Sequence, residues 1–577
     1  MLHKILEQKL QQAVAAVLPD AGLGGVLVRP CPDPKFGDYQ SNALMALAKA
    51  RKLNPRQLAT DVAARLDIAQ WCEPVQVAGA GFLNFRLKPA AMAQALQDAA
   101  RGGPLFFEKA AQPRCVVIDF SSPNVAKPMH VGHIRSTILG YSLTRILRLL
   151  GHRVIADNHI GDWGTQFGKL LVGWKTDLNA EALRADPIAE MERLYQTVNR
   201  NCENDPIVLE AARQELVKLQ SGDEENLRIW REMIALSESQ FQRIYARLGI
   251  KFDCQFGESY YNPHLQSVVR ELADLGLARA SEGAMVVFFD DLPDLKGNPA
   301  LIQKSDGGFN YTTTDLATLQ FRLEGGTWDA KPDELIYVTG APQQLHFKQL
   351  FAIFRRWHPE SNMKLAHVWF GSIQGEDGKP FKTRTGDTVR LEDLLDEAEE
   401  RAFKVVAEKN AELSEAQQRE IARVVGLGAI KYGDLSQNRQ SDYVFSWDKM
   451  LALQGNTAPY LLYAYTRVRS IFRKGGESEP GSATAEITLE APEETALARH
   501  LLNFGLALEA AADDYRPNFL CSYLHELAGH FARFYENCPV LKAEGVSRLS
   551  RLALSDLTAR VLKQGLDVLG IETTEQM

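Results

Sequence analysis

The sequence predicts a multidomain protein whose central α/β domain is built on a doubly wound parallel sheet. A small α/β module precedes this domain, and an all-helical domain follows it. The chain has 577 residues, which is too long for one hydrophobic core. Residues 111–400 alternate strand-like and helix-like segments, as a parallel sheet with crossover helices requires. Residues 401–577 contain long amphipathic helical runs and few strand signals.

The N-terminal module is predicted to span residues 1–110. Helical periodicity covers residues 3–18, 54–67 and 89–101. The segment VQVAGAGFLNFRL (75–87) alternates polar and apolar residues, which predicts a strand or a hairpin.

The central domain is predicted to begin with the strand CVVIDFSS (115–122), followed by a helix from His130 that stops at Gly151. RVIADNHIGD forms the next strand and loop. The later predicted elements are the strand ELIYVTGA (334–341), the helix LHFKQLFAIFRRW and the strand HVWFGSIQ (367–374). Insertions are expected around residues 170–310, helical at first and then with short strands. In the C-terminal domain, the polar segment 474–486 predicts a loop between helices.

Composition narrows the class of protein. No window of eighteen residues is free of charge, which argues against a membrane span and leaves the cytoplasm as the expected location. The seven cysteines are widely spaced and form no CxxC pair, so neither a disulfide framework nor a structural metal site is expected. The net charge of −8 argues against a nonspecific nucleic-acid binder, but it permits RNA binding through local basic patches.

The stretch SSPNVAKPMHVGHIRST (121–137) carries the strongest chemical signal. His130 and His133 are three residues apart, so they share one face at the first turn of the predicted helix. Backbone N–H groups and the helix dipole favour phosphate there, and imidazoles can donate hydrogen bonds to its oxygens. Gly132 leaves room for a nucleotide and Lys127 adds a positive charge, so the set suits a transferring α-phosphate. A chance pair of histidines or a metal pair are the alternatives, although no acidic or thiol partner stands at a ligand spacing.

PNVAKPMHVGHIRST after an apolar strand resembles the signature of class I aminoacyl-tRNA synthetases, and its upstream Asn and Lys resemble the arginyl-tRNA synthetase family in particular. The resemblance continues along essentially the whole chain, in FGDYQSNALM, NHIGDWGTQFG, KLQSGDEE, ESYYNP, DGGFNYTTTDLAT, DGKPFKTRTG, IKYGDLSQNR, GNTAPYLLYAYTR and LDVLGIETTEQM.

The resemblance implies a Rossmann-type catalytic domain and a two-step reaction. Arginine and ATP, accompanied by Mg2+, form arginyl-adenylate and pyrophosphate, and the arginyl group then passes to the terminal adenosine of tRNA-Arg. It also implies a monomer that generally needs bound tRNA for the first step, with a helical domain that binds the anticodon.

The resemblance also implies an arginine pocket. Its candidate residues are Asp119, Asn124, His133, Tyr311, Asp315 and Gln343. Asp119, Asp315 and Tyr311 would surround the cationic side chain, whereas Asn124 and Gln343 would hold the α-amino and carboxylate end. Carboxylates suit the planar fork of guanidinium donors. On the residues alone, Asp315 could equally be a helix-start residue and Asp119 could cap a strand end.

For ATP, the resemblance implies contacts from His130, Gly132, His133, Lys127, His367, Phe370, Lys379, Lys382 and Arg384. His130, His133, Lys127 and Lys382 are the catalytic candidates, and backbone near His367 and Phe370 is expected to edge the adenine. DGKPFKTR (377–384) occupies the place of the family's mobile lysine loop in a degenerate form, and a plain surface hairpin is the alternative. Gly340 and Pro342 depart from the charged residues of many relatives. His159 and Trp163 are expected to line the site or to pack in its core.

For tRNA, the stretch 457–474 interleaves tyrosines with basic residues, which suits stacking on unpaired bases and contact with phosphates. A core helix with inward tyrosines is the alternative. By resemblance, the tRNA-contacting candidates are Tyr460, Tyr463, Arg467 and Met577 in the C-terminal domain, and Gln40, Asn42, Phe82 and Asn84 in the N-terminal module.

Three other functions are less consistent with the sequence. A class I synthetase for glutamate, glutamine or cysteine would want a basic pocket or a zinc site, which the matched positions do not supply. A small nucleotidyltransferase would lack the helical domain. A non-catalytic tRNA-binding relative would not need His130, His133 and Lys127 intact.

Overall fold

The computed structural model describes residues 1–379, 381, 389–475 and 486–577. Its N-terminal module holds a four-stranded sheet of order β1-β2-β4-β3, packed with three helices. The strands are β1 (Arg29–Pro30), β2 (Tyr39–Ser41), β3 (Gln76–Ala78) and β4 (Phe82–Phe85), and the helices are α1 (Leu2–Val17), α2 (Ala43–Arg51) and α3 (Pro55–Ala63), with a short turn η1 (Leu23–Gly25). The antiparallel pair β3–β4 confirms the predicted hairpin. Helix α2 was not predicted.

The central sheet has four strands in the order β11-β10-β5-β6, and all its pairs are parallel. They are β5 (Cys115–Asp119), β6 (Arg153–Asp157), β10 (Glu334–Tyr337) and β11 (Lys364–His367). The chain builds outward in one direction from β5 to β6 and in the other from β10 to β11. The order therefore reverses between β5 and β10, and such a switch point opens a crevice at the carboxyl ends of the strands.

Both faces of this sheet are covered, as the prediction of a doubly wound sheet requires. Val116 and Ile118 of β5 belong to the large core that includes α5 (Val131–Leu149) and the C-terminal helices. Cys115 and Val117 point to the other face and pack with α12 (Leu265–Asp274), α13 (Tyr311–Leu323) and α14 (Gln344–Trp357). This alternation follows from the two-residue period of a strand.

The predicted strand 367–374 was wrong in its extent. β11 ends at His367, and only β12 (Ile373–Gln374) is extended further on, where it pairs with β13 (Tyr443–Val444). Between them, the backbone N–H of Gly371 donates to the carbonyl of Arg439 at 2.9 Å. Val368 and Phe370 still donate to Tyr337 and Thr339 at the end of β10, and only from Gly371 onward does the C-terminal segment supply the hydrogen-bond partner.

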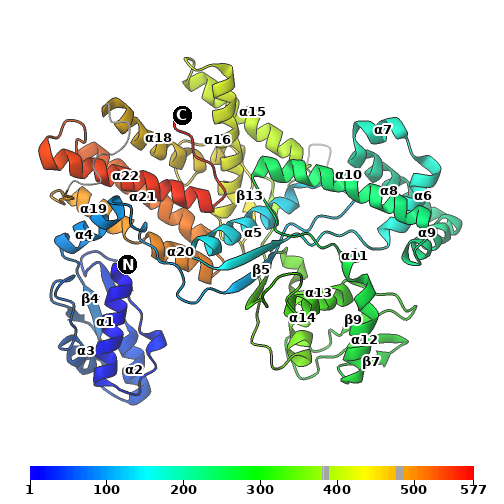
Figure 1. Ribbon diagram of the computed structural model, residues 1–577, viewed down its shortest axis with the longest axis horizontal. Coiled ribbons are helices and arrows are strands. Elements are labelled where there is room, and N and C mark those ends of the chain that lie inside the picture. The colour runs from blue at the N-terminus through cyan, green and yellow to red at the C-terminus, as the bar shows by residue number, and fades with distance from the viewer. Residues whose placement is uncertain (380, 382–388, 476–485) are drawn as a thin grey trace.

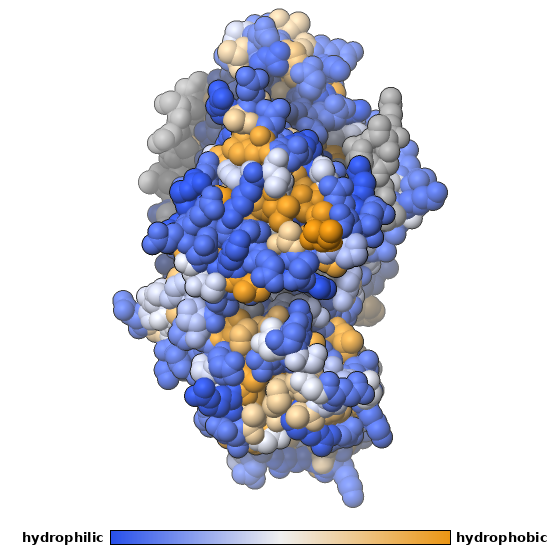
Figure 2. Space-filling view, turned by 90° about the vertical axis from the view of Figure 1, so that its right-hand side faces the viewer, coloured by the Kyte–Doolittle hydropathy of each residue, from blue (hydrophilic) through white to orange (hydrophobic). Residues whose placement is uncertain are grey.

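The two insertions differ in structure, as predicted. The first is helical: α6 (Gln166–Asp177), α7 (Ala180–Ala185), α8 (Pro187–Asn204), α9 (Pro206–Gln220) and the long α10 (Glu224–Leu248). The second contains α11 (Glu258–Tyr261), η2 (Asn262–His264), α12, β7 (Ala278–Ser281), β8 (Ala284–Val287) and β9 (Ala300–Gln303). Figure 2 shows apolar residues gathered on the outer face of the helical insertion, where Ile207 of α9 is 78% exposed.

The last part of the chain is helical. Its elements are α15 (Leu391–Lys409), α16 (Glu415–Leu435), α17 (Trp447–Met450), α18 (Ala458–Gly475), α19 (Pro492–Leu501), α20 (Phe504–Asp513), α21 (Asn518–Asn537) and α22 (Gly545–Val568). Helix α4 (Pro89–Ala100) packs on α19 and α22 and lies between the rest of the N-terminal module and these C-terminal helices (Figure 1). The predicted boundary at residue 400 falls inside α15. Most of the predicted loop 474–486 lies outside the described residues.

No helix in the described part of the chain is long and apolar enough to cross a bilayer.

Candidate active site

The candidate site lies at the switch point of the central sheet, where β5 ends at Asp119 and the loop to α5 begins. Three non-glycine residues of this loop have positive φ: Ser121 at 73°, Ser122 at 47° and Ala126 at 62°. Such conformations cost free energy and persist only where surrounding contacts hold them. The strained backbone thus lies in the segment 121–137, for which the sequence predicted nucleotide binding.

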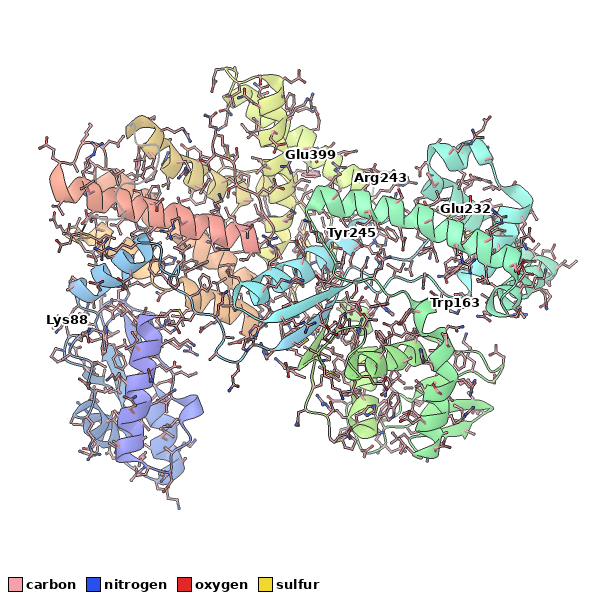
Figure 3. All side chains as sticks on the ribbon, in the orientation of Figure 1. Lys88, Trp163, Glu232, Arg243, Tyr245 and Glu399 are labelled. Carbon is pink, nitrogen blue, oxygen red and sulfur yellow. The ribbon has the colours of Figure 1, made fainter. Side chains whose placement is uncertain are left out.

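Helix α10 of the insertion holds this loop in place. The hydroxyls of Tyr245 and Ser121 lie 2.8 Å apart, and the backbone N–H of Ala126 donates to Oγ of Ser237 at 2.9 Å. Figure 3 shows Tyr245 near the end of α10 that lies over α5 and β5. Sequence reasoning missed Tyr245 and Ser237, because each stands more than 110 residues after its partner.

His130 and His133 lie together at the start of α5, with ring centroids 4.0 Å apart. His130 is the N-cap residue, and its Nδ1 accepts the backbone N–H of Gly132 at 3.1 Å. Nδ1 of His133 accepts the backbone N–H of His130, also at 3.1 Å. A Cβ on residue 132 would stand 2.8 Å from Cε1 of His130. The space beside Gly132 is thus taken by the His130 ring, a reason for glycine that we had not predicted.

Both imidazoles are neutral near pH 7. Burial lowers the pKa of His133 to about 4, and the charge of His130 adds to the effect. Burial also lowers the pKa of His130, with a further contribution from the positive charge of Lys127. Since each Nδ1 is an acceptor, the proton of each neutral ring is on Nε2. The start of α5 therefore presents two Nε2–H donors. The backbone N–H groups of this turn already have partners within the protein, because Val131 donates to the carbonyl of Val389 and His133 to that of His130.

Two of the four basic residues predicted to contact ATP phosphates, Lys127 and Lys379, are among the described residues. Lys127 is exposed, and its ammonium lies 5.1 Å from the centre of the Tyr195 ring on α8. Lys379 is exposed on a tight turn in which its backbone N–H donates to Oδ1 of Asp377. Lys382 and Arg384 lie outside the described residues.

The predicted pair Tyr311 and Asp315 stands one turn apart on α13, as expected if that segment is helical. Because α13 begins at Tyr311, Asp315 lies in its second turn and is not the helix-start residue that the alternative reading required. Nε2 of His346 on α14 lies 2.6 Å from Oδ2 of Asp315, and the Tyr311 ring meets the same imidazole edge-on at 4.8 Å. Sequence reasoning missed His346, which only the packing of α14 on α13 brings to this position.

Asp119 lies deeper than predicted. Its side chain is 8% exposed, and Oδ2 accepts a hydrogen bond from the fully buried Arg322 at 2.7 Å. The same guanidinium nitrogen lies 2.7 Å from Asp157, and Oδ1 of Asp119 accepts from the Ser122 hydroxyl. Asp119 therefore has protein partners on both oxygens, and its contact with arginine stays a prediction.

Asn124 and Gln343 are both exposed near the switch point. Asn124 forms a bridge with Gly161, and Gln343 ends the short η3 (Ala341–Gln343) that includes the unusual Pro342. Gly340, just before η3, forms a bridge with Phe370. The side chains of Asn124 and Gln343 are therefore not buried in the hydrophobic core.

The predicted adenine edge is largely paired within the protein. The backbone N–H of Phe370 donates to Thr339, and its carbonyl accepts from Ala341 at 2.9 Å. Nε2 of His367 lies 2.8 Å from the Thr339 hydroxyl, and its ring stacks on Phe347 at 4.3 Å. Burial lowers the pKa of His367 to about 4, so this ring is also neutral. The backbone of Phe370 has less freedom to bind a base than we predicted.

Glu258 of α11 is a group that sequence reasoning did not single out. The pKa of Glu258 is raised to about 7, mainly by burial; the charge of His159 lowers it, and the charges of Asp315 and Asp162 raise it. Both ring nitrogens of His159 are buried without a hydrogen-bond partner among the described residues. Trp163, near α11 in Figure 3, meets Trp230 edge-on at 5.7 Å. The two unpaired ring nitrogens of His159 are thus compatible with its predicted role in lining the site, whereas Trp163 is packed against Trp230.

In the N-terminal module, three of the predicted tRNA-contacting residues share one face of the sheet: Gln40, Phe82 and Asn84. Gln40 pairs with Asn84 across β2 and β4, and Phe82 lies two residues from Asn84. Asn42 is exposed at the start of α2, but Asn84 is only 5% exposed. Burial therefore argues against a direct contact between Asn84 and RNA.

In the C-terminal domain, Tyr463, Arg467 and Met577 line one cavity of about 600 Å³ together with Arg473 and Tyr535. The Arg467 guanidinium donates to the Tyr463 hydroxyl at 2.7 Å and lies 5.6 Å from the Tyr535 ring. Tyr535, which is 38% exposed, was not predicted. Tyr460 packs against His525 at 5.4 Å outside this group, so the predicted set is only partly brought together.

Family comparisons agree with this division of the chain. Residues 95–447 match the family described as tRNA synthetases class I (R), catalytic domain. Residues 461–577 match the DALR anticodon binding domain, and residues 2–87 match the arginyl tRNA synthetase N terminal domain.

Individual relatives match over their full length. The arginine–tRNA ligases of Chromobacterium violaceum and Klebsiella pneumoniae are each 45% identical, with 100% of both chains covered. Among solved structures, the arginyl-tRNA synthetase of Thermus thermophilus has a TM-score of 0.83 at 27% identity and covers 100% of each chain. That of Plasmodium falciparum has a TM-score of 0.82 at 28% identity and covers 100% of this chain and 99% of its own. Because the agreement extends along the whole chain and beyond the histidine signature, the protein belongs to the arginyl-tRNA synthetase family of class I tRNA synthetases.

Proposed function

We propose that the protein is an arginine–tRNA ligase that activates L-arginine with ATP and transfers it to tRNA-Arg. The observation that carries the chemistry is the pair of neutral imidazoles at the start of α5, whose Nε2–H groups point away from the backbone N–H groups bound by Nδ1. Uncharged donors at a helix N-terminus suit a phosphate that gains charge in the transition state.

In the first step, a carboxylate oxygen of arginine attacks the α-phosphorus of ATP. The bond from that phosphorus to the bridging oxygen breaks, and pyrophosphate leaves with the electron pair. His130 and His133 would donate hydrogen bonds to the α-phosphate, and Lys127 would stabilise the phosphates that leave. Lys379, Lys382 and Arg384 are proposed to assist, with Mg2+ accompanying ATP as substrate.

In the second step, a hydroxyl of the terminal adenosine of tRNA attacks the arginyl carbonyl, and AMP leaves. Asp315, held by His346, is the proposed contact for the guanidinium, with Tyr311 beside it. Asn124, Gln343 and His133 would hold the other end of the amino acid, and Asp119 stays a candidate. The cavity around Arg467 is proposed to bind the anticodon. Location in the cytoplasm, a monomeric state and the domain boundaries at residues 110 and 400 also stay predictions.

The test is amino-acid-dependent charging. Purified protein, ATP, Mg2+ and total tRNA are incubated with each of the twenty amino acids in turn, and acid-precipitable aminoacyl-tRNA is counted. Arginine should be charged at least about 100-fold faster than lysine or glutamate, since a site built for charged hydrogen bonds rejects analogues strongly. Faster charging with another amino acid would move the protein to a different specificity.

A further inference from the structure

We infer that Tyr195, on helix α8 of the helical insertion, is a positioning residue for Lys127. This inference rests on the proposed function, because it gives Lys127 a role in stabilising the phosphates. It goes further because it gives the helical insertion a role in catalysis, through the position of Lys127.

The first support is the placement of Lys127 itself. Its ammonium lies 5.1 Å from the centre of the Tyr195 ring, within the range of a cation–π interaction. Lys127 is exposed, and no carboxylate lies within salt-bridge distance of it in the described part of the chain. A long exposed lysine has many rotamers, so an aromatic face is the feature here that restricts its ammonium.

The second support is that α8 is tied to the signature on the other side of His130. Arg390 reaches Asp186, the N-cap of α8, at 3.3 Å and Glu192 at 3.5 Å. The backbone of Arg390 forms a bridge with His130. Glu192 and Tyr195 stand three residues apart, so one face of α8 contacts both flanks of the His130 turn.

The third support is a second cation on the same ring. Lys169 of α6 lies 5.9 Å from the Tyr195 ring centre, and its ammonium donates to Oδ1 of Asn199 at 2.5 Å. Asn199 is one turn after Tyr195 on α8, so Lys169 is fixed by two residues of that helix. Repulsion between the two ammonium groups disfavours rotamers that bring Lys127 closer to Lys169, so the second charge further restricts where Lys127 can lie on this ring.

The experiment is a double-mutant cycle on adenylate formation, measured by ATP–pyrophosphate exchange with tRNA present. The variants are Lys127→Ala, Tyr195→Leu, their combination and the matched control Tyr195→Phe, which keeps the ring. Tyr195→Leu should lower kcat about fivefold, the rate equivalent of an exposed cation–π contact, with the KM for arginine unchanged. Tyr195→Phe should keep the full rate, because no hydrogen bond of the Tyr195 hydroxyl is found in the described residues.

The combination separates positioning from structure. If Tyr195 acts through Lys127, Tyr195→Leu causes no further loss in the Lys127→Ala background. A fivefold loss in both backgrounds would overturn the inference, since it would mean that the ring only stabilises the insertion. If kcat falls with Lys127→Ala but not with Tyr195→Leu, the inference about Tyr195 is overturned and the proposed role of Lys127 is kept. No loss with Lys127→Ala would overturn the role that the proposed function gives Lys127, and the inference with it.

Discussion

Nε2 of His346 lies 2.6 Å from Oδ2 of Asp315, although the two residues belong to different helices. The ring of Tyr311 contacts the same imidazole edge-on. The hydrogen bond from His346 involves only one oxygen of the Asp315 carboxylate, Oδ2. Asp315 is 24% exposed, which leaves its other oxygen open to the space at the switch point. This relationship supports the proposal that Asp315 binds the guanidinium.

Asp315→Ala should raise the KM for arginine by roughly 100-fold or more, because a guanidinium would lose its charged partner. His346→Ala should raise it only about five- to tenfold, since it removes one hydrogen bond that orients the carboxylate. Steady-state pyrophosphate exchange measures both, with the KM for ATP as the control. An equal rise in the KM for ATP would place Asp315 outside the amino-acid pocket.

His133→Ala should slow adenylate formation by roughly 100- to 1000-fold, the usual effect of losing one transition-state donor. The change also removes the acceptor for the backbone N–H of His130, so protein stability must be checked. Single-turnover kinetics at saturating ATP and arginine give the rate, and thermal unfolding gives the control. An unchanged rate in a folded variant would contradict the role of His133.

The sequence predicted the parts of the site that depend on local spacing. His130 and His133 share a face because they are three residues apart at a helix start, and Tyr311 and Asp315 share one because they are four apart. The alternation of strands and helices likewise predicted the parallel sheet, since its crossover connections follow directly from the chain order.

The contacts of the site that the sequence did not predict depend on long-range packing. His346 reaches Asp315, and Tyr245 reaches Ser121, through contacts between elements that no local period links. The sequence placed Asp119 correctly at the end of a strand, but it could not show that Arg322 enters the core from α13 and pairs with it. The change of hydrogen-bond partner after Phe370 has the same cause, because Gly371 donates to Arg439 in the helical domain.

Arginine binding should release protons near pH 7 through Glu258. Its carboxyl pKa is raised to about 7 in the free protein, and a bound cation would lower that pKa by favouring the charged form. Affinity for arginine should therefore rise as the pH increases from about 6 to 8 and then level off. Calorimetry at pH 7 in two buffers of different ionisation enthalpy measures the release, expected at about half a proton.

Glu258→Gln should abolish this proton release, whereas the exposed Glu415→Gln should leave it unchanged. Release that persists in Glu258→Gln would assign the proton to another group of the pocket, such as Asp162, whose pKa burial also raises.

Tyr535→Ala should weaken tRNA binding by roughly 10-fold, since stacking on one base contributes about 1–3 kcal/mol. Arg467→Ala should weaken it as well and lower the slope of log K against log salt by about 0.7 for one single-strand phosphate contact. Filter binding at several salt concentrations distinguishes the two effects. Tyr535→Phe, which keeps the ring, serves as the control, and an unchanged affinity in Tyr535→Ala would remove this cavity from the tRNA interface.

Arg322→Met should destabilise the central domain by about 3–5 kcal/mol, because it leaves the carboxylates of Asp119 and Asp157 buried without a cation. Arg419→Met is the matched control. Arg419 pairs with Glu415 on the surface, where both side chains are more than half exposed, so its loss should cost less than about 1 kcal/mol.

The loss in Arg322→Met should also depend on pH. Burial already raises the pKa of Asp157, and without the guanidinium its carboxyl gains a stronger preference for the neutral form. The folded variant then binds more protons than its unfolded chain, so its stability should fall as the pH rises from 5 to 8. Urea denaturation at both pH values measures this fall. An equal loss at pH 5 and pH 8 would show that the variant suffers from lost packing and not from two unpaired charges beneath the switch point.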